Sequence, residues 1–268
     1  MAEIKPQKQN YRNLTSRIAG YLSNLKRPGW FVKAFIFLFR KFYKINLKDF
    51  EVPENGFKTF NSFFTRKLKK NTRIIDEGII SPVDGSVFDF GKVDPDNKIY
   101  VKFKHYYIDE LLSDKFDTMS SYVVLYLAPS DYHRVHAGFD MFIDEISYLP
   151  GTLFSVKEKT VNKRDRVYCR NERIVIHGIS KYGKFYFILV GALIVGKVKL
   201  CFDSELRTNI RKGIYSKKVF DNPIQIKKAE EVGFFEMGSS VIILLEDPCL
   251  SSVIKPIKSP IRFGETIV

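Results

Sequence analysis

Cysteine is scarce in this chain of 268 residues, which contains only Cys169, Cys201 and Cys249. Their number is odd, and no two of them form a Cys-x-x-Cys pair. This usage argues against a disulfide framework and against a zinc site, and it favours a reducing compartment. An apolar content of 45% and a charged content of 28% nevertheless predict a folded globular protein.

Long apolar stretches near the N-terminus are also missing. The stretch from Trp30 to Phe39 is broken by Lys33, and it has about half of the ~20 residues that a membrane-spanning helix needs. The N-terminus is polar and shows no signal-peptide pattern. We therefore expect neither a spanning helix nor a cleaved leader.

Acidic residues are nearly absent from residues 1–50, where eleven Lys and Arg stand against two acids, a surplus of nine out of a net charge of +14. Apolar side chains recur there at helical spacing, and Pro28-Gly29 would separate two helices. Basic flanks around an aromatic block favour helices that lie in the headgroup region of an anionic phospholipid membrane. The alternative is a helix packed on the protein's own core. Nucleic acid is not expected, because the aromatic residues form one block instead of alternating with the charges.

Residues 51–268 have a different pattern, with short β-rich stretches between turn residues. Two short helices are predicted, at 61–68 with Asn61 as the cap and at 108–112, and a hairpin turn is predicted at 182–184. Because long crossover helices are missing, we predict an α+β fold: N-terminal amphipathic helices followed by a β-rich, mostly antiparallel catalytic domain. The clearest strands are 122–128, 173–177, 185–190, 197–202 and 241–245.

Three separated clusters carry side chains that are suited to catalysis. Asp84 stands in Ser-Pro-Val-Asp-Gly at 81–85, where a turn aspartate commonly bonds its own backbone. His133 and His136 follow the predicted strand 122–128; their spacing could suit a metal, but no third ligand is near, so acid–base chemistry is the better functional interpretation. Ser239 follows Gly238 at the entrance of the predicted strand 241–245. Each cluster alone also has a structural explanation, as a turn, a pair of loop histidines or a bulge.

Together, Asp84, His136 and Ser239 supply a carboxylate that would orient His136, a base and a hydroxyl nucleophile. No Gly-x-Ser-x-Gly elbow surrounds the serine, and the entrance of a buried strand is a poor place to meet an external ester. The Ser239 hydroxyl can, however, reach the carbonyl of Gly238 through a five-membered ring. Acyl transfer, elimination and hydrolysis would then cut the chain and leave a pyruvoyl group, which can act as an electron sink during decarboxylation.

With these three clusters in this order, the chain resembles the phosphatidylserine decarboxylase family. Supporting stretches are Phe-Asn-Ser-Phe-Phe-Thr-Arg-Lys-Leu-Lys at 60–69, Pro-Gly-Thr-Leu-Phe-Ser-Val at 150–156, Asn-Glu-Arg at 171–173 and Val-Gly-Ala-Leu-Ile-Val-Gly at 190–196. The resemblance departs mildly at Met237, Gly138 and Ser240, and Gly138, in place of a common proline, could loosen the histidine loop.

The resemblance implies a self-cleaving proenzyme, cut between Gly238 and Ser239 into a large chain, 1–238, and a small chain, 239–268. Asp84, His136 and Ser239 would form the processing triad, and Ser239 would become the pyruvoyl group. That group would form a Schiff base with phosphatidylserine and release CO2 to give phosphatidylethanolamine, with His133 as proton donor or relay. No metal and no separate cofactor would be needed.

The resemblance also implies a peripheral protein on the cytoplasmic side of the cell membrane, and it leaves a homodimer open. Two other interpretations of the sequence remain. One is a membrane-associated serine hydrolase that uses Asp84, His136 and Ser239 without self-cleavage, and the other is a non-catalytic lipid-binding protein. Candidates to hold the substrate's anionic groups are Arg66, Lys67, Arg134, Arg164 and Arg166.

Overall fold

A computed structural model describes residues 11–26, 28–113, 118–193, 197–206, 208–210, 213–236 and 239–268. Its centre is an eight-stranded sheet in which every neighbouring pair is antiparallel. This confirms the α+β, mostly antiparallel fold. In spatial order the strands are β10 (Ser216–Ile226), β6 (Met141–Leu149), β7 (Arg173–Ser180), β8 (Gly183–Gly191), β12 (Ser239–Leu245), β4 (Ser121–Leu127), β1 (Gly85–Lys92) and β13 (Pro260–Ile261).

Strand β12 lies between β8 and β4 and is buried on both faces. Val241, Ile243 and Leu245 point to one core cluster, and the two residues between them point to the other. A strand that is covered on both sides needs a continuous apolar sequence. Burying these five aliphatic side chains contributes about 10 kcal/mol to folding, at roughly 1.5–3 kcal/mol each.

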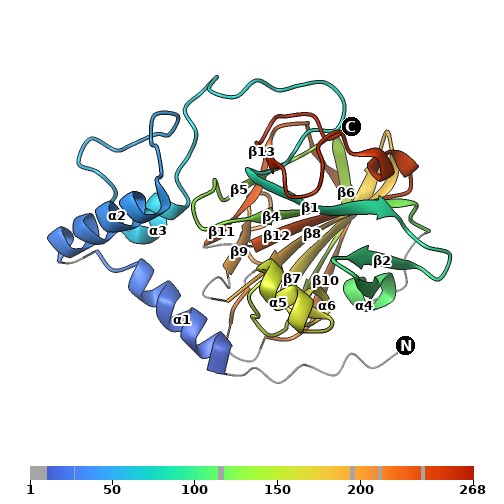
Figure 1. The fold of residues 1–268 in the computed structure, drawn as a ribbon, viewed down its shortest axis with the longest axis horizontal. Helices are drawn as coiled ribbons and strands as arrows, with labels where there is room; N and C mark the ends of the chain where they lie inside the picture. Colours follow the sequence, from blue (N-terminus) through green and yellow to red (C-terminus); the bar gives the residue numbers. More distant parts are fainter. Residues whose placement is uncertain are drawn as a thin grey trace.

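Each face of the large sheet is covered by smaller elements (Figure 1). One face is covered by a three-stranded sheet, made of β5 (Arg134–His136), β11 (Glu231–Glu236) and β9 (Lys197–Leu200). The elements on the other face are β2 (Lys98–Val101), β3 (Lys104–Tyr107), α4 (Ile108–Leu112), α5 (Glu158–Lys163) and α6 (Val167–Arg170). The 3-10 helix η1 (Pro248–Ser252) connects β12 toward β13.

The N-terminal helices stand together on one side of this body, as Figure 1 shows. They are α1 (Tyr11–Ser23), α2 (Gly29–Tyr43) and α3 (Phe60–Phe64). Val32 and Ile36 of α2 pack on phenylalanines of α3, so this face of α2 is buried inside the protein. None of the described helices is long and apolar enough to cross a bilayer.

Most of the predicted local elements are confirmed, but the helix predicted at 61–68 ends at Phe64, and its predicted capping residue is wrong. Helix α4 occupies residues 108–112 as predicted, and β7 and β8 form a hairpin whose Gly183 has a φ of 79°. Asn61 does not cap α3. Thr59 does so through a capping box with Ser62, because its side chain reaches the free amide of the first turn. The side chain of Asn61 instead donates to Asn24 next to α1.

Candidate active site

Ser239 is the first residue of the central strand β12. It lies opposite Leu127 of β4 and opposite Gly191 of β8, which has no side chain. Its side chain is completely buried, and among the described residues its Oγ has no hydrogen-bond partner. A buried hydroxyl without a partner costs about 1–3 kcal/mol, so such a group calls for a functional explanation. Gly238 and Met237 lie outside the described residues.

Asp84 precedes β1, and both of its carboxylate oxygens bond groups outside its own turn. Arg73 donates to Oδ2 at 2.7 Å, and the backbone N–H of Phe263 donates to Oδ1 at 2.8 Å. Burial raises the pKa of the Asp84 carboxyl, while Arg73 and the Phe263 amide oppose that rise. The carboxylate therefore connects segments that are far apart in the sequence.

His136 ends β5, and both of its ring nitrogens are occupied. Nδ1 lies 2.8 Å from the carbonyl oxygen of Ala229, which can only accept, so Nδ1 carries the proton. Nε2 then accepts the hydroxyl proton of Tyr132 at 2.9 Å. The imidazole also stacks on the ring of Phe263 at 3.8 Å. Burial lowers the pKa of His136 to about 4, so the ring is neutral at pH 7.

Asp84 and His136 form hydrogen bonds with different groups and not with each other. We expected Asp84 to orient His136, but the hydrogen bonds of His136 go to Ala229 and Tyr132, and those of Asp84 go to Arg73 and Phe263. Phe263 contacts both residues, one through its amide and the other through its ring. The structure thus brings Asp84 and His136 together around Phe263.

His133 is fully buried just before β5. Its Nδ1 lies 2.8 Å from the carbonyl oxygen of Asp131, and its Nε2 has no partner in the part of the chain that the structure describes. Its ring lies against Phe64, and burial lowers the pKa of His133 to about 3. Its carbonyl oxygen accepts the amide of Phe235, directly before β5, in which Val135 faces the core between the two sheets. Ser239 lies on the same side of β12 as Val241, which belongs to that core.

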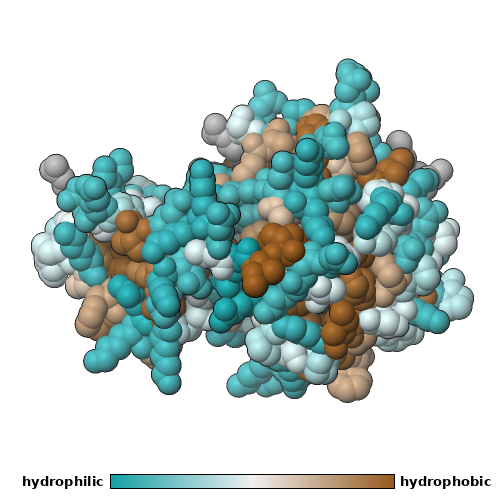
Figure 2. Space-filling model, turned by 90° about the horizontal axis from the view of Figure 1, so that it is seen from above, coloured by the Kyte–Doolittle hydropathy of each residue, from teal (hydrophilic) through white to brown (hydrophobic). Residues whose placement is uncertain are grey.

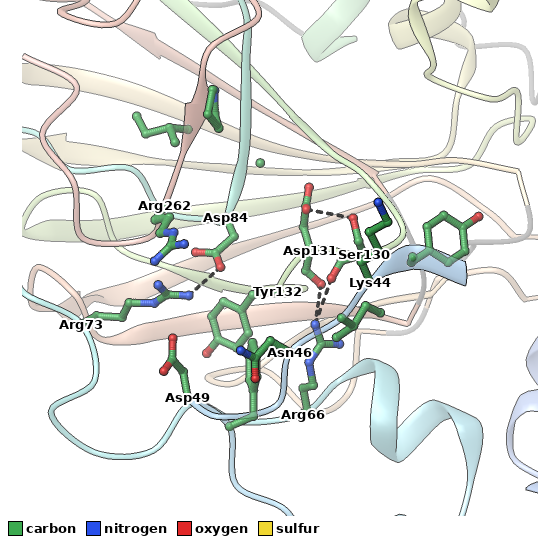
Figure 3. A pocket seen from close by; sticks show the side chains of 16 residues that line it. Lys44, Asn46, Asp49, Arg66, Arg73, Asp84, Ser130, Asp131, Tyr132 and Arg262 are labelled. Atoms are coloured by element: carbon green, nitrogen blue, oxygen red, sulfur yellow. Dashed lines mark hydrogen bonds and ion pairs between the residues drawn. The ribbon is translucent and has the colours of Figure 1, made fainter. Parts of the chain in front are cut away.

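A cavity of about 400 Å³ lies in front of Asp84 and Tyr132, between the end of α2 and the body. Figure 3 shows Asp84 flanked by Arg73 and Arg262, with Arg66 facing Ser130 and Asp131 on the other side. Arg66 donates to the carbonyl oxygens of both residues, at 3.0 and 3.3 Å. Of the five basic residues suggested for the substrate's anionic groups, Arg66 is the one that lines this cavity.

Two of the other suggested residues are held in ion pairs, Arg134 with Glu231 and Arg166 with Glu110. Arg164 lies over the ring of Phe154. Sequence reasoning missed Arg73 and Phe263, since neither lies in one of the three clusters. Tyr132 does lie inside the histidine cluster, and its position next to His133 was the available signal.

The fold and this site define the class: a β-rich α+β protein whose candidate nucleophile is buried in its own central sheet. Residues 60–268 match the model of the phosphatidylserine decarboxylase family. Proteins named phosphatidylserine decarboxylase proenzyme are similar to the chain along most of its length. The one from Hamiltonella defensa is 34% identical over 90% of this chain and 88% of its own length. For the proteins from Psychrobacter cryohalolentis and Campylobacter jejuni, the identities are 36% over 86% and 84%, and 33% over 94% and 97%.

The chain therefore belongs to the phosphatidylserine decarboxylase family, as its motifs indicated, and is a member of a family of decarboxylases.

Proposed function

We propose that this protein is a self-cleaving proenzyme that decarboxylates phosphatidylserine to phosphatidylethanolamine, in phospholipid biosynthesis. The observation that carries the proposal is the buried Ser239 at the first position of the central strand, whose Oγ has no hydrogen-bond partner among the described residues. The names of the relatives, all proenzymes, agree with it. A hydrolase that acts on external esters is less well supported, because the Ser239 side chain has no exposed surface.

The proposed cut balances with one water molecule. Ser239 Oγ attacks the carbonyl carbon of Gly238 and gives up its proton, the C–N bond breaks, and the Ser239 nitrogen takes a proton, so the peptide becomes an ester. Loss of the Ser239 Cα proton expels the Gly238 carboxylate and leaves a dehydroalanine. Water then replaces the nitrogen, which departs as ammonia, and a pyruvoyl group remains at residue 239.

The residues around Ser239 fit such a group. Gly191 opposite Ser239 leaves room beside a small carbonyl group, and the buried position excludes bulk water. When present, the pyruvoyl carbonyl supplies an electron sink for a substrate amine that loses CO2. His133 is fully buried, and its Nε2 has no partner among the described residues, so it is suited to deliver a proton.

The large and small chains would stay together after the cut. Strand β12 of the small chain pairs along its whole length with β4 and β8 of the large chain. Such a strand, bonded on both sides, keeps its place without the peptide bond before it.

Intact-mass analysis of the purified protein tests this proposal. We expect two fragments divided between residues 238 and 239, the smaller with an N-terminus blocked to Edman degradation. Ser239→Ala is expected to stay uncut and inactive, with unchanged folding. An uncut parental chain with full decarboxylase activity would refute the proposal.

Attachment to the cytoplasmic side of the membrane is proposed from the surface of α1 and α2. Trp30 and Phe42 are 72% and 79% exposed, and further apolar side chains of both helices are exposed: Leu14, Ile18, Tyr21, Leu22, Phe31, Phe37 and Leu38. Figure 2 shows apolar surface on the helical part of the molecule between long hydrophilic side chains. Lys33, Arg40 and Lys41 lie on α2, and each basic residue near an anionic leaflet contributes about 1 kcal/mol to membrane binding.

Vesicle binding tests this attachment in the full chain. Trp30→Ser with Phe42→Ser removes two exposed aromatic side chains, each worth roughly 1.5–3 kcal/mol when buried, so affinity for anionic vesicles should fall at least about 100-fold. Ile179→Ser, at a position 52% exposed on β7 of the body, is the matched control and should leave affinity unchanged. Equal affinity in both variants would contradict the attachment.

A further inference from the structure

The C-terminal segment 262–268 lies against the stretch that precedes β1. Backbone hydrogen bonds hold it there: Ser81 N–H donates to Glu265 O, Gly264 N–H to Ser81 O, and Ile267 N–H to Ile79 O, at 2.8, 3.1 and 2.7 Å. Gly264 has a φ of 95°, and a Cβ there would meet the carbonyl oxygen of Ile74 at 2.4 Å. The backbone conformation of this turn therefore requires glycine, and the turn sets the position of the residue before it.

That residue is Phe263, which makes two contacts of different kinds. Its backbone N–H donates to Asp84 Oδ1, across 179 residues of sequence. Its ring stacks on the imidazole of His136, with an interplanar angle of 17°, and lies 6.4 Å from the ring of Tyr132. Phe263 is buried, so water does not compete for either contact.

We propose that Phe263 is a positioning residue for self-cleavage, whose amide orients the Asp84 carboxylate and whose ring holds the His136 imidazole in place. This inference rests on the proposed function, since it concerns the same cut. It explains how two residues without a mutual hydrogen bond are kept in one arrangement. It also assigns the C-terminal segment a role, because the part of the protein that becomes the small chain supplies both Ser239 and the residue that positions Asp84 and His136.

The geometry explains why an aromatic ring is suited to this position. A flat ring at 3.8 Å covers the face of the imidazole and leaves its two nitrogens in the plane for Ala229 and Tyr132. A branched aliphatic side chain of similar volume would fill the space, but it would not hold the imidazole of His136 at one tilt. A tilt of the imidazole breaks the alignment with the Tyr132 hydroxyl, and proton transfer is sensitive to that alignment.

The experiment compares Phe263→Leu with Phe263→Tyr, which keeps the stacked ring, and with Phe88→Leu, which changes a phenylalanine of nearly equal exposure in a core cluster that does not contain Phe263. We expect Phe263→Leu to slow self-cleavage at least about tenfold. Phe263→Tyr should restore most of the rate, and Phe88→Leu should cut at close to the parental rate.

A second measurement does not depend on cleavage. In the uncut Ser239→Ala background, NMR titration follows the His136 ring, which is surrounded by Tyr132, Glu231 and Arg134 and lies near Asp84 and Arg73. Phe263→Leu should raise the pKa of His136 from about 4 toward the ordinary value, because solvent reaches a less well covered ring. Phe88→Leu should not shift this titration.

The outcomes separate this inference from the function on which it rests. If the parental protein is never cut, the proposed function fails, and the NMR titration alone decides whether Phe263 holds His136. If the parental protein is cut and Phe263→Leu is cut equally fast, only the role of Phe263 is refuted. A slower cut together with an unmoved His136 titration also refutes it, because the effect then comes from general loss of stability.

Discussion

The ion pair between Arg73 and Asp84 offers a sharp test of how the site is held. The two side chains are only 10% and 15% exposed, with 2.7 Å between Arg73 Nη2 and Asp84 Oδ2. Arg73→Met keeps most of the side chain's length and removes the charge. The carboxylate then stays buried, with the Phe263 amide as its remaining hydrogen-bond partner among the described residues.

The expected loss of stability is large. Removing one partner of a buried pair typically costs about 3–5 kcal/mol, because the other charge is left uncompensated. For a chain of this size that corresponds to a fall in melting temperature of roughly 6–20 °C. Ser239→Ala is the suitable background, since it keeps the chain in one piece.

The loss should also depend on pH with a definite sign. Burial already raises the pKa of Asp84 above its unfolded value of 3.8, and the loss of Arg73 raises it further. A raised carboxyl pKa favours the folded state when the group is protonated, and that contribution disappears as the pH rises through the folded-state pKa. The destabilisation by Arg73→Met should therefore be smaller at pH 5 than at pH 8.

Urea unfolding at both pH values measures this effect, with Arg262→Met as the matched control. Arg262 lines the same cavity, but its charge acts on Asp84 more weakly. Combining Arg73→Met with Asp84→Asn should recover part of the loss, because no buried charge remains. A loss below 1 kcal/mol, or one of equal size at pH 5 and pH 8, would refute this reasoning.

Three further predictions concern neighbouring residues. His133 and His136 have lowered pKa values of about 3 and 4, so on acidification the unfolded chain binds protons before the folded protein does. Lowering the pH from 7.5 to 5.5 should therefore cost about 1 kcal/mol of stability for each histidine. In urea unfolding, His136→Gln should reduce the pH dependence of the free energy of unfolding by the contribution of His136. Gly138→Ala places a Cβ 2.8 Å from the carbonyl oxygen of Ile80 and should destabilise by about 1–3 kcal/mol, whereas Gly20→Ala on α1 meets no atom within 4 Å and should not; equal melting temperatures would count against this packing. His133→Ala should still be cut, as seen by intact mass, but should lose at least about 100-fold in decarboxylation rate, and a fully active variant would remove His133 from the reaction.

Gly138 also changes an interpretation made from the sequence. A glycine in place of a common proline could loosen the loop that carries the histidines. In the structure its backbone lies close against Ile80, and its carbonyl oxygen accepts the Ile80 amide at 3.0 Å. The absence of a side chain permits this close approach, so in this structure Gly138 serves tight packing.

Some strands could not be found from the sequence, for a physical reason. Strand β10 is long but lies at the edge of the sheet, with mostly exposed side chains and an internal proline. Edge strands need no apolar alternation, and proline and lysine are favoured there because they prevent further pairing. Strand β12 shows the opposite: it is buried on both faces, and its apolar sequence revealed it directly.

By itself the sequence determined the antiparallel β-rich body, the central strand and the residue types of the candidate site, because hydrophobic periodicity and local motifs are written in neighbouring residues. Tertiary structure alone decided the partners of those residues. Asp84 bonds Phe263 far along the chain and an arginine from a segment without any motif, and His136 bonds a carbonyl oxygen and a tyrosine hydroxyl instead of the expected carboxylate. Such contacts arise when strands close into a sheet, and no short stretch of sequence encodes which distant group will arrive at a given oxygen or nitrogen.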